Sequence, residues 1–124
     1  MLLIDAANVV GSRPTGWWRD RPGAARALYD RVRAAARDGS LPLPVVLVLE
    51  GQARRGVEES TEDGVRVVHA RGEGDDTLAA VAAEADEPVT LVSADRGLGE
   101  RVRGTGGSVV GPGWLLGRLP AQPA

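Results

Sequence analysis

The run Val45–Leu49 constrains the fold more than any other stretch of this sequence. It reads Val-Val-Leu-Val-Leu, and Glu50 ends it. A strand with one face in solvent alternates apolar and polar residues, whereas a continuous apolar and β-branched run is typical of a strand covered on both faces. Helices provide that cover in parallel sheets. The run therefore predicts an α/β protein.

Four further apolar runs have a similar character, and segments with helical spacing lie between them. The predicted strands cover residues 2–4, 45–49, 65–69, 89–93 and 108–110, and the predicted helices cover residues 22–39, 72–85 and 98–103. Strands that alternate with helices through right-handed crossovers place helices on both faces of one sheet. We therefore expect a three-layer α/β/α sandwich with a central, mainly parallel sheet of about five strands.

The remaining segments are predicted to be loops and turns. Residues 9–23 form a loop with two adjacent tryptophans, residues 51–64 form a polar surface loop with room for one helical turn, and residues 111–116 form a final turn. At 124 residues the chain is long enough for one core and too short for two of ordinary size. We expect a single domain over residues 1–119 and a disordered tail over residues 120–124.

The composition excludes several classes of chemistry. All 15 basic residues are arginines, which excludes a P-loop lysine, a Schiff base and a lysine general base. The chain has no cysteine, which excludes disulfides, thiolate catalysis and cysteine-based zinc sites. A net charge of -2 is not the basic balance of a protein that coats nucleic acid. Because no apolar run approaches the roughly 20 residues of a membrane span, we expect a cytoplasmic protein without a membrane partner.

Acidic side chains follow four of the predicted strands. They are Asp5, Glu50, the group Glu73, Asp75 and Asp76, and Asp95. In open α/β sheets, ligands bind outside the carboxyl ends of the strands, so these acids are expected to meet at one edge. Each acid alone is explained by capping a helix or closing a turn. Together they would repel one another unless a cation offsets their charge, and Mg²⁺ or Mn²⁺ is the natural oxygen-ligated choice.

Three of these segments resemble one known family. Leu-Leu-Ile-Asp5-Ala-Ala-Asn8 is similar to the opening of the NYN branch of the PIN-like nucleases, where a strand ends in Asp and Asn follows three residues later. Glu-Gly-Asp75-Asp76-Thr-Leu resembles the acid-rich helix start of PIN-like and flap-type nucleases, and Val-Ser-Ala-Asp95-Arg resembles the Ser-x-Asp segment after it. The motifs span nearly the whole chain in the family's order, and within the family they resemble the YacP-like group of ribonucleases.

This resemblance implies a PIN-like fold and a metal-dependent ribonuclease that acts on single-stranded or structured RNA. The residues that it assigns to catalysis are Asp5, Asn8, Asp76 and Asp95. Asp5, Asp76 and Asp95 are the expected metal ligands, with Asp75 beside them as a cap or auxiliary acid. Asn8 is expected to orient the substrate or a metal-bound water. The Mg²⁺ or Mn²⁺ ion would activate water for in-line attack on phosphorus.

The expected RNA-binding residues combine aromatic surfaces with guanidinium groups. They are Arg13, Trp17, Trp18, Arg19 and Arg96. Tryptophan stacking on bases and arginine contacts to phosphates are the pairing used for single-stranded nucleic acid. The alternative that one of the two tryptophans fills the core stays open.

The sequence is also compatible with other functions. The family often has a second Asp at the position of Gly97, and without it a fourth ligand would have to come from Asp75, Glu73 or Glu50. A catalytically weak RNA-binding module of the same fold is therefore the second hypothesis, and hydrolysis of free nucleotides is a further alternative. A phosphorylation receiver domain would need a lysine that this chain lacks. A homodimer is left open.

Overall fold

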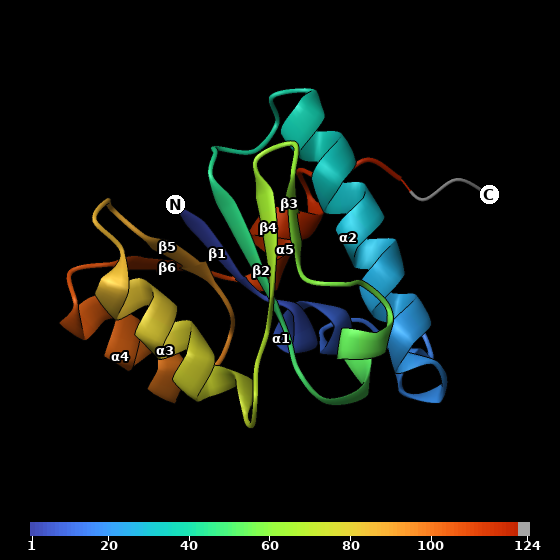
Figure 1. Cartoon of the computed structure of the whole chain (residues 1–124), viewed down its shortest axis with the longest axis horizontal. Helices are drawn as coiled ribbons and strands as arrows, with labels where there is room; N and C mark the ends of the chain where they lie inside the picture. The colour runs from blue at the N-terminus through green and yellow to red at the C-terminus, as the bar shows by residue number, and fades with distance from the viewer. Residues whose placement is uncertain (122–124) are drawn as a thin grey trace.

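Six strands form the central sheet of the computed structural model, which describes residues 1–121 (Figure 1). The sheet order is β3-β4-β2-β1-β5-β6, and every neighbouring pair is parallel except β3 with β4. The strands are β1 (Leu2–Asp5), β2 (Val45–Leu49), β3 (Ser60–Glu62), β4 (Val65–His69), β5 (Thr90–Val92) and β6 (Ser108–Val110). The predicted α/β class and mainly parallel sheet are confirmed, with one strand more than expected.

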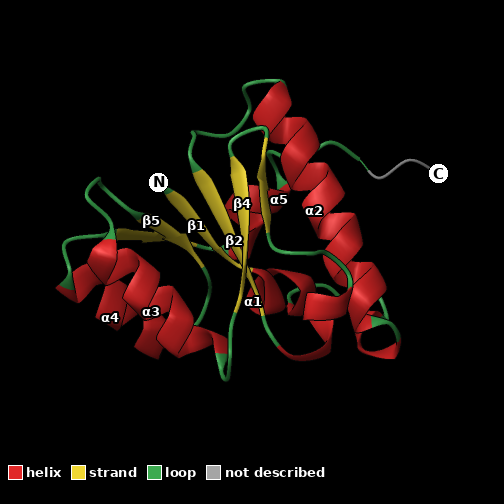
Figure 2. Ribbon diagram, viewed as in Figure 1, coloured by secondary structure: helices red, strands yellow, loops and turns green. Residues whose placement is uncertain are grey.

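Helices cover both faces of this sheet (Figure 2). The α-helices are α1 (Ala6–Gly11), α2 (Arg21–Arg37), α3 (Gly74–Glu84), α4 (Arg96–Gly104) and α5 (Pro112–Leu116), and the 3-10 helices are η1 (Trp17–Arg19) and η2 (Gly51–Arg55). Helices α1, α2 and α5 contribute to one buried cluster, and α3 and α4 contribute to a second cluster on the opposite face. The expected three layers follow from this division.

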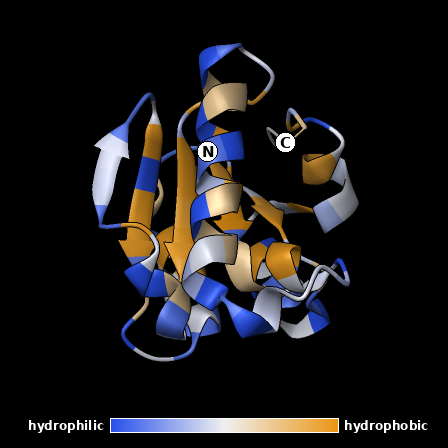
Figure 3. Cartoon of the chain, turned by 90° about the vertical axis from the view of Figure 1, so that its right-hand side faces the viewer, coloured by the Kyte–Doolittle hydropathy of each residue, from blue (hydrophilic) through white to orange (hydrophobic). Residues whose placement is uncertain are grey.

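Strand β2 shows why the central run has to be continuously apolar. All five of its residues are buried. Val45, Leu47 and Leu49 belong to the cluster beneath α2, whereas Val46 and Val48 belong to the cluster beneath α3 and α4. Successive side chains of a strand point to opposite faces, so a strand between two helical layers needs an apolar residue at every position. Figure 3 shows the central strands in hydrophobic orange behind an α2 that carries hydrophilic segments.

Strand β3 lies in the segment predicted as a surface loop. It pairs with β4 through a tight turn at Asp63 and Gly64, whose φ angles are 54° and 77°. Two left-handed residues form the type I′ turn that suits a two-residue hairpin, and Asp-Gly is its strongest sequence signal. Strand β3 itself is short and polar because it forms an edge of the sheet. Its residues therefore give no apolar pattern.

Short helices also occur where a turn and a loop were expected. Helix α1 starts directly after β1, and the Asp5 carboxylate accepts a hydrogen bond from the Asn8 backbone N–H as its cap. At six residues, α1 is too short for helical spacing to be recognised. Helix α2 begins one residue after Asp20, which caps it, as the neighbouring Pro22 predicts.

The C-terminal segment begins with an ordered contact. The Pro120 carbonyl oxygen accepts a hydrogen bond from Arg31 Nε at 2.8 Å. Residues 122–124 of the predicted disordered tail lie outside the described residues. Within the part of the chain that the structure describes, no helix is both long enough and apolar enough to cross a membrane.

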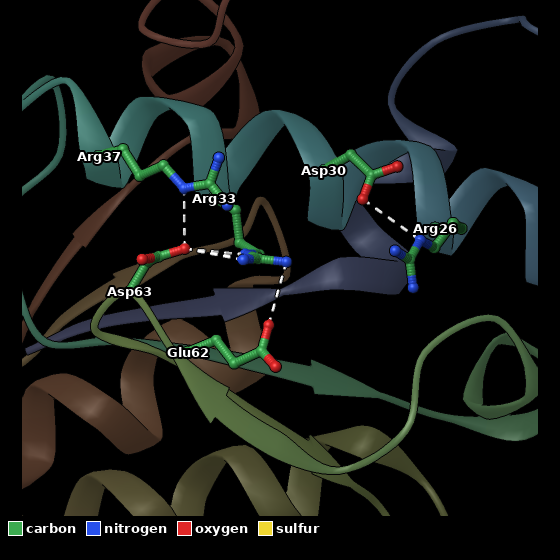
Figure 4. Close-up of polar contacts among 6 residues, drawn as sticks. All are labelled: Arg26, Asp30, Arg33, Arg37, Glu62 and Asp63. Atoms are coloured by element: carbon green, nitrogen blue, oxygen red, sulfur yellow. Dashed lines mark hydrogen bonds and ion pairs between the residues drawn. The ribbon is translucent and has the colours of Figure 1, made fainter.

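Arginines of α2 hold the β3–β4 hairpin at the surface (Figure 4). Asp63 Oδ2 accepts hydrogen bonds from Arg33 Nη2 and Arg37 Nε, each at 2.8 Å. Arg33 Nη1 also pairs with Glu62 at 3.1 Å. The hydrogen bonds from Arg33 and Arg37 lower the pKa of Asp63 from its ordinary value. The turn therefore joins β3 to β4, and ion pairs attach the resulting hairpin to α2.

We expect Asp63→Asn to lower the thermal midpoint at neutral pH and to have little effect in acid. A carboxyl group with a lowered folded-state pKa stabilises the fold above its unfolded pKa of about 3.9, and the contribution is lost as the pH falls through the folded-state value. Asparagine tolerates the left-handed φ of this position. Thermal melts at neutral pH and near pH 3 provide the measurement. The matched control is Asp30→Asn, which removes an exposed pair with Arg26 inside α2. Equal losses in the two variants would contradict the role given to the hairpin.

Candidate active site

Asp5 lies at the carboxyl end of β1 and is one of only two buried polar residues among residues 1–121. Its Oδ1 accepts from the Asn8 backbone N–H at 3.3 Å, and its Oδ2 accepts from Ser93 Oγ at 2.9 Å. Burial raises the pKa of Asp5, and the charges of Asp75 and Glu50 raise it further, while the two hydrogen bonds act in the opposite direction. A buried carboxylate with two fixed contacts is therefore held at the edge of the sheet among other acids.

A hydrogen-bond network connects Asp5 to the end of β5. Ser93 Oγ, which donates to Asp5, accepts from the Asp95 backbone N–H at 3.1 Å. Asn8 Oδ1 accepts from the Ala94 backbone N–H at 2.7 Å. Asp95 Oδ1 accepts from the Leu98 backbone N–H at 2.9 Å, and so caps α4. The predicted residues Asp5, Asn8 and Asp95 are thus brought together. Ser93, which was assigned no role from the sequence, links them.

Helix α3 is capped from another strand. Glu50 Oε2, at the end of β2, accepts a hydrogen bond from the Gly74 backbone N–H at 2.6 Å. Glu73 occupies the cap position, but its side chain makes no capping bond. Asp75 and Asp76 lie in the first turn, where the helix dipole favours negative charge. Asp75 is expected from the sequence to be a cap or an auxiliary acid, and the cap alternative is wrong because Glu50 takes that place.

Asp75 and Asp76 have different surroundings. Asp75 is half-buried, and its pKa is raised first by burial and then by the charges of Asp95 and Glu50. The Asp76 side chain is 83% exposed and forms an ion pair with Arg101 Nη1 at 3.1 Å. The structure therefore brings Asp75, and not Asp76, into the group that contains Asp5, Glu50 and Asp95.

The chemistry of this group suits a hard divalent cation. All its donors are carboxylate oxygens, and the pKa values of Asp5 and Asp75 are raised first by burial and then by neighbouring negative charges, both of which a bound cation would offset. Among residues 1–121, no three His, Cys, Asp or Glu side chains form a ready ligand group. Mg²⁺ keeps several of its waters and commonly binds through one or two carboxylates, so the residues present fit a hydrated ion.

The two adjacent tryptophans lie on η1, and Trp17 lines a cleft together with Glu50 of this group. Trp18 is 54% exposed, and Trp17 is half-buried; neither belongs to the two buried clusters. Their rings meet edge to face, with centroids 6.1 Å apart. The guanidinium carbon of Arg19 lies 5.9 Å from the Trp18 ring, and that of Arg21 lies 5.5 Å from the Trp17 ring. The alternative that one tryptophan fills the core is therefore not supported.

The two other predicted substrate-binding residues are exposed. Arg96 is the first residue of α4, next to Asp95, and Arg13 follows α1 beside a hollow that Trp17 also lines. Neither guanidinium forms an ion pair within residues 1–121. Both are free to contact phosphate.

Comparison with known proteins identifies a similar fold among solved structures. No protein-family model matches this sequence, and no curated protein matches it either. Among solved structures, the chain is similar to a mutant form of Rae1 (YacP) from Bacillus subtilis, with a TM-score of 0.66 and 16% sequence identity. The similarity covers 93% of this chain and 71% of that chain. The chain therefore has a YacP-like α/β fold, as its motifs predict. Its place in the NYN branch stays a prediction.

Proposed function

We propose that this protein is a metal-dependent ribonuclease. The observation that carries the proposal is the buried Asp5, fixed by Ser93 and Asn8 and surrounded by further carboxylates at the carboxyl edge of the sheet. A structural role alone does not require acids to be gathered where they raise one another's pKa. The YacP-like fold supports the motif resemblance that implies a nuclease. The exposed tryptophan and arginine side chains near the site favour RNA as the substrate.

Asp5 would hold the metal, with Asp75 and Asp95 beside it to bind the ion directly or through its waters. The motif resemblance implies Asp76 as a ligand instead of Asp75, and the test below decides between these two. Bound Mg²⁺ or Mn²⁺ supplies an activated water and neutralises charge on the leaving oxygen. The chain's own residues position these acids. Ser93 and the Asn8 backbone fix both oxygens of Asp5, and Glu50 anchors the first turn of α3, on which Asp75 lies.

Asn8 and Arg96 are assigned to the substrate. The Asn8 side-chain carbonyl is held by the Ala94 N–H, and its Nδ2 makes no hydrogen bond within residues 1–121. This amide is therefore available to donate to a phosphate or water oxygen. Arg96 lies next to Asp95 and forms no ion pair among the described residues. It can therefore bind a phosphate oxygen of the RNA.

The neighbouring aspartates of α3 provide a matched test. We expect Asp75→Asn to lower Mn²⁺-dependent cleavage of a single-stranded RNA by more than about 100-fold, since second-shell changes at metal sites already cost about 10 to 100-fold. Asp76→Asn should cost less than about tenfold, because its carboxylate is exposed and pairs with Arg101. Both variants lose one charge from the same helix turn, and circular dichroism checks that each keeps the fold.

The assay is single-turnover cleavage of an end-labelled RNA with and without Mn²⁺. A greater loss in Asp76→Asn than in Asp75→Asn would restore Asp76 as the ligand. Cleavage that survives Asp75→Asn, Asp76→Asn and Asp95→Asn alike would overturn the nuclease proposal.

A catalytically weak RNA-binding module is the second candidate. It is favoured by Gly97, an exposed residue in the first turn of α4 that leaves this edge without a further carboxylate. The absence of a ready three-ligand group among residues 1–121 points the same way. RNA affinity without turnover in excess Mn²⁺ would favour this candidate. Release of phosphate from free nucleotides, with RNA left intact, would favour a nucleotide hydrolase.

A further inference from the structure

A cleft of about 410 Å³ lies beside the candidate active site. Its walls come from α1, η1, the start of α2, η2 and the segment before α3. Glu50 and Glu73 line it, and Glu50 also anchors the first turn of α3. The cleft and the acidic group therefore share a wall, and a ligand in the cleft would lie next to whatever the acids hold. Its size is at the lower end of small-molecule pockets, which run from about 300 to 1,000 Å³.

The walls of this cleft suit a flat ring. Ala6, Ala7 and Ala53 contribute little bulk, and Trp17 is the largest side chain among them. Arg21 lies over one face of the Trp17 ring, and Trp18 packs against Trp17 edge to face, so the indole is held in one orientation. A base would stack on the face that Arg21 does not cover. Aromatic side chains held in this way are platforms on which bases of a single strand stack.

The polar groups of the cleft select the kind of ring. Glu50 and Glu73 are acceptors, and Arg21, whose guanidinium lies over the Trp17 ring, is the one cation of the lining. The net negative charge disfavours a phosphate in the cleft. Glu50 has one oxygen engaged by Gly74, whereas the Glu73 carboxylate makes no hydrogen bond within residues 1–121. A free carboxylate accepts best from two adjacent N–H donors, which guanine presents at N1 and N2. Uracil presents one N–H between two carbonyl oxygens, which would face the carboxylate with like charge.

We propose that this cleft binds a guanine base of a single RNA strand, with Trp17 as the stacking surface and Glu73 as the acceptor for the guanine N–H groups. The neighbouring phosphate of the strand would then lie at the acidic edge. The assignment of the strand as RNA rests on the proposed ribonuclease function, whereas recognition of guanine rests on the cleft alone. The consequence is a preference for cleavage next to unpaired guanines.

The first test uses neutral nucleosides and no metal, so that it does not depend on cleavage. Guanosine and uridine are titrated into the ¹⁵N-labelled full chain, and affinities are taken from the amide and indole shifts. Guanosine should bind about tenfold more tightly than uridine, the discrimination of one bidentate contact. Trp17→Ala should weaken guanosine binding about tenfold, as expected for one lost stacking partner. Glu73→Gln should remove the preference for guanosine and leave uridine binding unchanged.

A second variant blocks the cleft with a larger side chain, so that the test does not rely only on removing Trp17. Ala7 is exposed on α1 and lines the cleft, so Ala7→Phe should abolish nucleoside binding without disturbing the core. Its matched control is Ala80→Phe, at an exposed position of α3. Trp114→Ala is the control for Trp17→Ala, because Trp114 is likewise half-buried with an arginine over its ring and lies outside the cleft lining.

The outcomes separate this proposal from the proposed function. Guanosine binding that survives Ala7→Phe, or equal affinities for guanosine and uridine, would overturn the guanine site even if the protein cleaves RNA. Guanosine binding that is lost in Ala7→Phe but not in Ala80→Phe would support the site even if no RNA is cleaved. Where cleavage occurs, cut sites mapped on a mixed-sequence single strand should lie next to guanines, and Glu73→Gln should scatter them.

Discussion

Replacing Asp5 with asparagine is expected to abolish RNA cleavage while leaving the fold intact. Asparagine has nearly the shape of aspartate, and it can keep contacts with the Asn8 N–H and with Ser93 Oγ. It lacks the charge that would hold the metal. The loss should exceed about 100-fold, because even second-shell changes at metal sites cost about 10 to 100-fold. Single-turnover cleavage in Mn²⁺ gives the measurement, and circular dichroism checks the fold.

The same substitution should raise thermal stability. Burial and neighbouring carboxylates raise the folded-state pKa of Asp5, so at neutral pH its ionised form opposes folding. That cost disappears as the pH falls toward the folded-state value, and a neutral asparagine removes it at neutral pH. A higher melting temperature with lost activity is the pattern of a residue kept for chemistry and not for stability.

Metal titration adds a further criterion. Mn²⁺ should raise the melting temperature of the natural protein, since a ligand that binds only the folded state stabilises it, and should do so far less in Asp5→Asn. Ser93→Ala is an informative companion, because it removes one contact of the carboxylate and leaves the charge. A variant Asp5→Asn that melts earlier and still cleaves RNA would assign Asp5 to capping α1 only.

The strands and the long helices can be predicted from the sequence, because the residue patterns that indicate them lie within each element. Strands β2, β4 and β6 have the predicted bounds, and α2 starts where Asp20 and Pro22 indicate. Helix α1 is too short for a periodic pattern, and β3 is a polar edge strand. The residues of β3 give no signal of a strand. Only the Asp63–Gly64 dipeptide after it, which favours a hairpin turn, indicates that a strand precedes β4.

The candidate site is predictable to the level of strand ends and no further. Asp5 and Asp95 follow strands of a parallel sheet, so their meeting could be expected. Which of Asp75 and Asp76 joins them could not be predicted from the sequence. Adjacent helical residues point about 100° apart, and the rotation of α3 about its axis depends on packing. That rotation is fixed in part by Glu50, which lies 24 residues before Gly74 in sequence. A cap from a distant strand has no local signature.

The cleft likewise depends on a contact that sequence does not show. Gly56 ends η2, and a side-chain carbon at this position would overlap the backbone carbonyl of Pro22 at the start of α2. Its φ of −79° is open to any residue, so glycine is needed here for space and not for backbone freedom. The close approach of η2 to α2 sets one wall of the cleft, which Ala53 lines.

Gly56→Ala is therefore expected to destabilise the protein strongly and to disrupt the cleft. The obstructing atom belongs to the backbone, which cannot rotate away, so the cost should reach or exceed about 2 kcal/mol, within the range for overpacked sites. Urea denaturation gives the free energy of unfolding, and guanosine titration reports on the cleft. The control is Gly113→Ala in α5, where an added carbon meets nothing within 4 Å. There the same substitution should stabilise the protein by about 0.5 to 1 kcal/mol, since alanine favours a helix. Opposite signs for one chemical change would show that η2 is held against α2 at Gly56, whereas a neutral Gly56→Ala would mean that this wall of the cleft is free to move.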